Sequence, residues 1–188
     1  LTPQTANSNA PEVSSACSRI GVTSCSGSYA GNINRAQYAM RVGGYTPQQL
    51  AEVPVVMSAI NQAWYDSNPN AVRRNLKREA HFYVLQDKAT GKISVSRITL
   101  SSLGAAEWTP PPPPRLATAI VLADFHTHPW LESDFGFPVR IPHGPSGGEG
   151  NFPGDIDALR YKRIPLGNIR DHTGLVFYDQ NGVIGNGH

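Results

Sequence analysis

Two histidines separated by one residue, His126 and His128, are the side chains whose spacing most directly suggests chemistry. They follow an apolar run over residues 118–123, which predicts a buried strand. Because side chains alternate between the two faces of a strand, positions i and i+2 project from the same face. Pro129 has no N–H to donate and is expected to end the strand directly after the pair. The pattern therefore predicts a metal site in which two imidazoles bind one ion.

Two acidic residues, Asp155 and Asp157, are the main candidates for a third ligand. They lie in the first turn of a helix that is predicted to begin at Pro153, after a loop rich in glycine and proline over residues 130–154. Two histidines and one carboxylate form the donor set of catalytic zinc sites, which leave one coordination position open. Acidic residues in a first turn also complement the helix dipole, so one of the two aspartates can have that role alone.

The length of 188 residues fits one well-packed domain, and the 16 prolines and 18 glycines predict many loops. A formal net charge of +2 does not favour a nucleic-acid partner. No apolar run approaches the 18 to 20 residues, roughly, of a membrane span, so no membrane partner is expected. The chain begins at Leu1 without a signal peptide, and we expect a processed product or a piece of a longer polypeptide.

The first 28 residues differ in composition from the rest of the chain. Residues 1–28 are rich in serine, asparagine and alanine without periodicity, which predicts an irregular N-terminal arm. Residues 29–188 are predicted to form the folded domain. Cys17 and Cys25 lie in the arm, where they can close a short disulfide loop or remain free thiols, and the sequence leaves both alternatives open.

The remaining pattern predicts an α+β fold, a single mixed β-sheet with packed helices. Thr46 and Pro47 have the residue types of a helix N-cap and first position. Apolar residues then recur at steps of three and four, with Pro54 as a possible kink: Leu50, Val53, Met57, Ile60 and Trp64. Strands are predicted over residues 79–85, 93–99, 118–128, 174–179 and 183–184. His81, on the first of these strands, is expected to face solvent or to pack.

Together these features resemble the JAMM (JAB/MPN-type) zinc metallopeptidases. They are most similar to the JAB-related domains at the C-terminal ends of bacterial Rhs-type and other polymorphic toxins. The resemblance covers residues 79–159, and its most specific part is His-Thr-His-Pro at residues 126–129. It implies a JAB/MPN-like fold with a cytidine-deaminase-like layout, and a Zn²⁺-dependent hydrolase that cleaves a peptide or isopeptide bond. Such a domain would be a secreted or delivered toxin or effector, with a protein or peptide substrate and an immunity or inhibitor protein as a further partner.

The family's functional residues can be matched one by one. His126 and His128 correspond to the two zinc-binding histidines, and Glu79 corresponds to the acid that deprotonates the attacking water. The family's acidic ligand follows a serine by three residues. This spacing selects Asp157 as the ligand if Gly154 replaces the serine.

Two alternatives to this choice of acidic ligand remain. Asp155 ranks second, because Gly-Asp-Ile is also similar to family sequences. Glu149 ranks third, because it follows Ser146 by three residues. In the first two cases the serine is missing, and losing one oxyanion donor costs about 2.7 to 4 kcal/mol of transition-state stabilisation. Ser146 is then the candidate replacement from the loop.

Three other functions compete with the peptidase prediction. A JAB-like domain that binds a partner without cutting it fits the missing serine. A zinc deaminase needs thiolates from a Pro-Cys-x-x-Cys motif, whereas the cysteines here lie far upstream of the histidines. A toxin nuclease is not supported by any basic cluster that would line a cleft.

Overall fold

The computed structural model describes residues 40–105, 108–135, 145 and 154–187. This part of the chain is an α+β fold with one mixed sheet, in which seven strands are described, and this confirms the predicted fold class. The predicted N-terminal arm over residues 1–28, including both cysteines, lies outside the described residues. Among the described helices, none is long and apolar enough to cross a membrane.

The sheet has an open path of six strands, with a seventh strand beside it. The path runs through β2 (Ile93–Val95), β1 (Ala80–Asp87), β4 (Ala119–Thr127), β5 (Leu166–Asp171), β6 (Gly174–Asp179) and β7 (Gly182–Gly187), and β3 (Thr99–Leu100) also pairs with β1. Only the described pair β4–β5 is parallel. A parallel pair requires a crossover connection, and this connection carries helix α5 (Asp155–Lys162).

The helix predicted from Pro47 is divided into two helices. Thr46 caps α3 (Pro47–Glu52) as predicted, and its Oγ1 accepts the Gln49 N–H at 3.1 Å. Val53 is extended before Pro54, which cannot continue the hydrogen-bond ladder, and α4 (Pro54–Asp66) begins there. Because α4 begins anew at Pro54, the side of the helix that is buried differs from the predicted one, and the predicted apolar stripe is partly wrong. Met57 is 48% exposed, and the buried residues of α4 are Val56, Ala59, Ile60 and Ala63.

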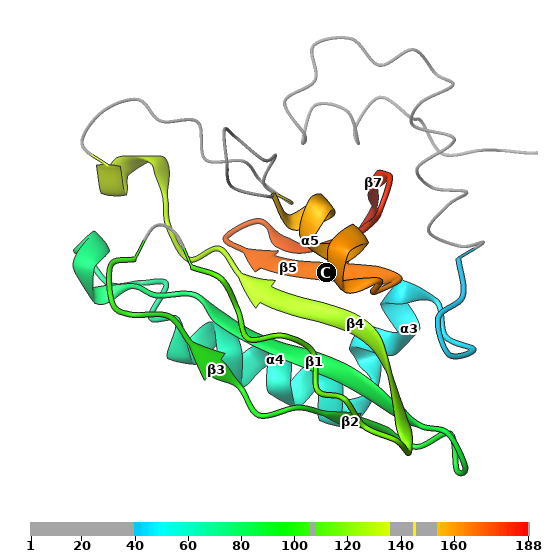
Figure 1. Ribbon diagram of the computed structural model, residues 1–188. Helices are drawn as coiled ribbons and strands as arrows, with labels where there is room; N and C mark the ends of the chain where they lie inside the picture. The colour runs from blue at the N-terminus through cyan, green and yellow to red at the C-terminus, as the bar shows by residue number, and fades with distance from the viewer. Residues whose placement is uncertain (1–39, 106–107, 136–144, 146–153, 188) are drawn as a thin grey trace, which may run out of the picture.

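Helices cover both faces of the sheet (Figure 1). Helices α3 and α4 cover one face, where Phe82 of β1 stacks on Phe125 of β4 at a centroid distance of 4.5 Å. Helix α5 covers the other face, where Leu159 packs with Ile169 and Tyr178. Burial on both faces explains why β4 is apolar over most of its length.

The sequence did not predict β5, and it predicted one strand where β2 and β3 stand. Gly167 and Asn168 are residue types that strands disfavour, which hides β5 in the sequence. The structure requires the glycine, because the Tyr178 ring of β6 occupies the place of any Cβ at position 167. Two short 3-10 helices complete the described elements: η1 (Arg74–Leu76) and η2 (Glu132–Phe135).

Candidate metal centre

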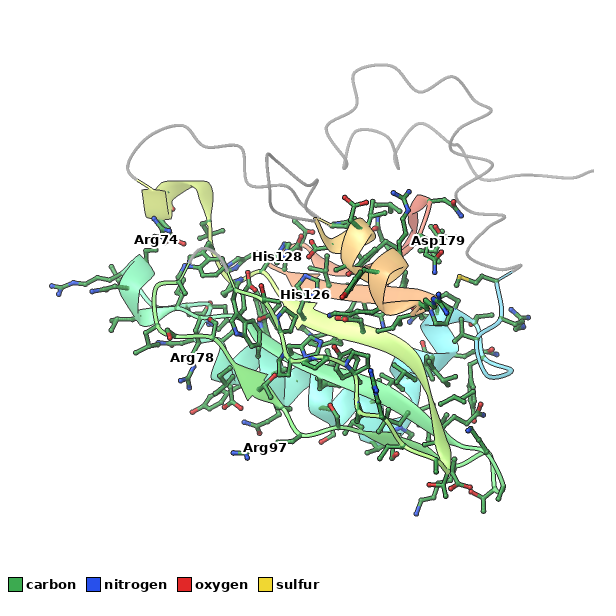
Figure 2. The ribbon with its side chains drawn as sticks, in the orientation of Figure 1. Arg74, Arg78, Arg97, His126, His128 and Asp179 are labelled. Atoms are coloured by element: carbon green, nitrogen blue, oxygen red, sulfur yellow. The ribbon has the colours of Figure 1, made fainter. Side chains whose placement is uncertain are left out.

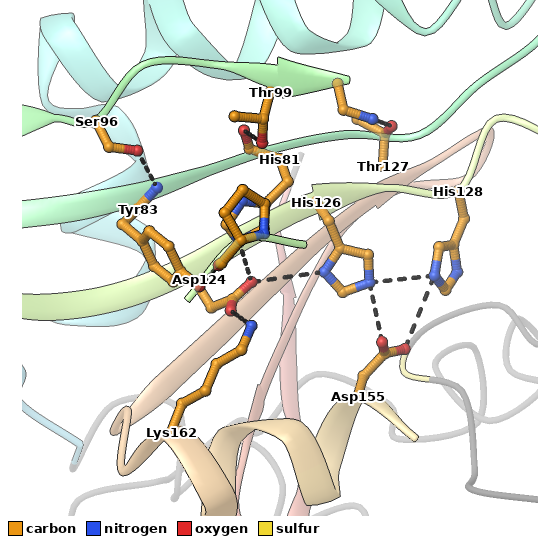
Figure 3. A network of polar contacts seen from close by, with 12 residues as sticks. His81, Tyr83, Ser96, Thr99, Asp124, His126, Thr127, His128, Asp155 and Lys162 are labelled. Carbon is orange, nitrogen blue, oxygen red and sulfur yellow. Dashed lines mark hydrogen bonds and ion pairs between the residues drawn. The ribbon is translucent and has the colours of Figure 1, made fainter. Parts of the chain in front are cut away.

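His126, His128 and Asp155 lie together where the end of β4 meets the first turn of α5 (Figure 3). One ligand atom from each of them lies within 4.8 Å of the others. The Nε2 atoms of the two histidines are 3.2 Å apart, and Asp155 Oδ1 is 3.2 Å from Nε2 of His126. Asp155 Oδ2 is 3.8 Å from Nε2 of His128. In the part of the chain that the structure describes, these three residues could hold a metal ion.

Strand geometry places the two histidines side by side, as Figure 2 shows. His126 is the penultimate residue of β4. His128 follows the end of β4, but its backbone N–H still donates to the Arg170 carbonyl of β5 at 2.9 Å. The extended backbone therefore continues through His128, and both side chains project toward α5 as the i, i+2 rule predicts.

Helix geometry decides which aspartate joins them. Asp155 is the first residue of α5 and contacts both histidines. Asp157, which the sequence spacing ranked first, lies two residues further, about 200° around the helix axis. It is exposed and pairs with Arg160 at 3.0 Å instead. The cluster thus contains the aspartate that the sequence ranked second.

The two histidines have opposite pKa shifts. Burial disfavours the charge on His126, but the carboxylates of Asp155 and Asp124 outweigh it and raise the pKa to about 10. Burial and the adjacent His126 charge lower the pKa of His128 to about 4. Two Nε2 atoms that face each other at 3.2 Å cannot both carry a proton, so at most one of them is a donor. Electron-rich atoms that converge on one point need a positive charge between them, which a proton or a metal ion can supply.

Glu79, the predicted general base, lies immediately before β1 and is half-buried. Its backbone is fixed by Ser101, whose Oγ accepts the Glu79 N–H at 3.0 Å. Burial raises the pKa of Glu79 to about 7, while the charge of His126 lowers it and that of Asp155 raises it. These electrostatic interactions place Glu79 near the cluster.

The sequence missed the residues behind His126. Asp124 is a buried residue two positions before His126 on β4. Its Oδ1 is 3.1 Å from Nε2 of His81, and its Oδ2 is 2.9 Å from Nζ of Lys162. Of the two expectations for His81, packing is confirmed and solvent exposure is wrong: the side chain is buried edge-on to Tyr83, opposite His126, and it also contacts the Asp124 carboxylate. The i, i+2 rule could have found Asp124, since it shares the face of His126.

Two of the predicted residues cannot be compared with the cluster, because Ser146 and Glu149 lie outside the described residues. The residue three positions before Asp155 is Phe152, so the family's serine is absent from that position of the sequence. No family model, curated protein or solved structure matches the chain. The JAMM resemblance therefore depends on the motif alone.

Proposed function

We propose that this chain is a zinc-dependent hydrolase of the JAMM type, with a JAB/MPN-like fold, that cleaves a peptide or isopeptide bond. The observation that carries the proposal is the convergence of His126, His128 and Asp155 in the vicinity of Glu79. These residues come from three separate segments of the chain and supply the residue types of a catalytic zinc site with its base.

The distances within the cluster support zinc in particular. Ligand atoms at the corners of a zinc tetrahedron are roughly 3.3 Å apart, given zinc–ligand bonds of about 2.0 to 2.2 Å. The two Nε2 atoms are 3.2 Å apart, and Asp155 Oδ1 is 3.2 Å from Nε2 of His126. The 3.8 Å contact with Nε2 of His128 is made by the other carboxylate oxygen, Oδ2. One ligand atom from each of the three residues lies within 4.8 Å of the others, so the side chains must move closer together to occupy three corners of such a tetrahedron.

The chemistry divides between the metal and the protein. When bound, a zinc ion would act as a Lewis acid on the carbonyl and make the attacking water more acidic. Glu79 would take the proton from that water and pass it to the leaving amine. A base is most effective when its pKa is close to the working pH, and burial brings the pKa of Glu79 to about 7.

One observation favours a second candidate, a JAB-like domain that binds its partner without cutting it. Phe152 stands where the family's serine would precede Asp155, so that oxyanion donor is absent. This alternative predicts the same metal content as the peptidase. A cleavage assay therefore has to separate them.

The first experiment measures zinc in tag-free protein by inductively coupled plasma mass spectrometry. We expect about one zinc per chain in the wild type and in Asp157→Asn, and little in His126→Ala and Asp155→Asn. Asp157→Asn is the matched control, because both aspartates lie in the first turn of α5 and only Asp155 contacts the histidines. Equal zinc in Asp155→Asn and wild type would show that Asp155 is not a ligand.

The second experiment tests cleavage with a panel of unstructured peptides and lysine-isopeptide conjugates. We expect Glu79→Gln to retain zinc and to lose turnover, because an amide cannot accept the proton. Cleavage that persists in Glu79→Gln would remove Glu79 from the mechanism. Zinc binding without cleavage of any probe by the wild type would favour the binding domain.

A further inference from the structure

A buried charged cluster behind the candidate metal centre is not used by the proposed reaction. It consists of Asp124, Lys162 and His81, whose side chains are 5%, 11% and 1% exposed. Lys162 also lies over the ring of Tyr83, with Nζ 5.4 Å from the ring centroid. Buried ion pairs are often no more stabilising than apolar residues of similar volume. A contribution to folding stability is therefore a weak explanation for the presence of three ionisable groups in this cluster.

Asp124 lies on the side of His126 that faces away from the other candidate ligands. Its Oδ1 is 3.8 Å from Nδ1 of His126, while Nε2 of the same ring is directed at Asp155 and His128 (Figure 3). Histidines that bind metal commonly donate their second N–H to a carboxylate, which fixes the ring and raises its basicity. A proton on Nδ1 leaves the Nε2 lone pair available to a metal ion. At 3.8 Å the Asp124 carboxylate is at ion-pair rather than hydrogen-bond distance from Nδ1, and a small side-chain movement would let it accept that N–H.

Lys162 connects the same carboxylate to the helix that carries the third ligand. Asp155 is the first residue of α5 and Lys162 is the last, seven positions apart and therefore on the same side of the helix. The ion pair between Lys162 Nζ and Asp124 Oδ2, 2.9 Å long, joins the end of α5 to β4. It restricts how far the helix can move from the strand, and with it the distance between Asp155 and His126.

We infer that Asp124 and Lys162 are positioning residues for the metal centre: Asp124 orients the His126 ring, and Lys162 holds α5 so that Asp155 reaches it. The inference rests on the proposed function, because it takes the cluster of His126, His128 and Asp155 to be a metal site. Both residues act through another group, Asp124 through the His126 ring and Lys162 through α5.

The test measures the affinity for zinc alone, by competition with a chromogenic chelator, together with the melting temperature. Lys162→Met removes the cation with little change in length, and we expect zinc affinity to fall about 10- to 100-fold, the usual effect of losing such an outer partner. The double variant Asp124→Asn/Lys162→Met removes both charges, so no unpaired charge stays buried. We expect it to melt near the wild-type temperature and still bind zinc at least tenfold more weakly.

Arg160→Met is the matched control on the same helix. Its ion pair with Asp157 is similar in length, 3.0 Å, but its side chain is 54% exposed, and we expect its zinc affinity to stay within twofold of the wild type. Visible absorption of the Co²⁺-loaded proteins adds a signal that a purely structural role would not change. We expect an altered spectrum for the lysine and double variants and the wild-type spectrum for Arg160→Met.

The outcomes separate the two proposals. Wild-type protein that binds no zinc would overturn the metal site and the positioning role together. Zinc bound by the wild type and equally well by the double variant, with unchanged Co²⁺ absorption, would overturn the positioning role alone and leave the metal site intact. If Lys162→Met does not fold, the double variant decides.

Discussion

The protonation of Glu79 leads to a prediction about stability that needs no substrate. Burial raises the pKa of this carboxyl from 4.5 to about 7 in the folded protein, whereas the unfolded chain keeps the ordinary value. Between these two values the folded state holds a proton that the unfolded state has lost. Rising pH therefore favours unfolding over this range, and above pH 7 the full cost applies.

The size of the effect follows from the two values. At about 1.36 kcal/mol per pKa unit, the free-energy cost of ionised Glu79 above pH 7 is at most about 3 kcal/mol. Glu79→Gln keeps the shape of the side chain and removes the ionisation. In metal-free protein we expect the variant and the wild type to have similar stability near pH 4.5, and the variant to be more stable by up to about 3 kcal/mol at pH 8.

Urea unfolding of metal-free protein at several pH values between 4.5 and 8.5 measures this difference. Glu52→Gln is the matched control, because it makes the same substitution at an exposed glutamate on α3. Adding zinc should reduce the advantage of Glu79→Gln, because a nearby cation attracts the carboxylate of the wild type. A difference between Glu79→Gln and wild type that does not grow with pH would refute the assigned burial of Glu79.

Three other predictions concern the metal centre and the fold. Zinc must displace the proton that His126 holds below about pH 10. The apparent affinity of the protein for zinc, measured by chelator competition, should therefore rise about tenfold per pH unit from pH 6 to 8. An affinity that does not change with pH would contradict this. Lys77→Met leaves the Asp134 carboxylate, whose side chain is 6% exposed, with the Leu131 N–H but without its cation, and should lower the free energy of unfolding by about 3 kcal/mol in urea. An unchanged value would show that the ion pair is dispensable. Thr46→Ala removes the cap of α3 and should cost about 1 kcal/mol by the same measurement, and a cost near zero would exclude a capping role.

Local sequence rules were sufficient for several parts of the structure. The apolar run before His126, together with the alternation of side chains on a strand, predicted that two imidazoles would project from one face. The residue types at Thr46 and Pro47 predicted the start of α3, and the predicted strand over residues 174–179 coincides with β6. Each of these features depends on interactions between residues that are close in the sequence.

Where these rules were incomplete, contacts with other elements decided the outcome. Gly167 and Asn168 gave no strand signal, because β5 is formed by pairing with β4 and β6 and by the Tyr178 ring that lies on the glycine. The solvent-facing alternative for His81 was wrong for a similar reason. Its surroundings come from β4 and α5, which are distant in the sequence.

The candidate metal centre combines both kinds of information. The sequence by itself determined that His126 and His128 form a pair and that an acidic residue follows in a helix. Only the tertiary structure selected Asp155 over Asp157, because the selection depends on which side of α5 packs against the sheet. The tertiary structure also brought Asp124 and Lys162 together beside the site. They are 38 positions apart in the sequence, so no short-range rule predicts their contact. Short-range geometry fixes how neighbouring side chains are directed, but packing decides what they meet.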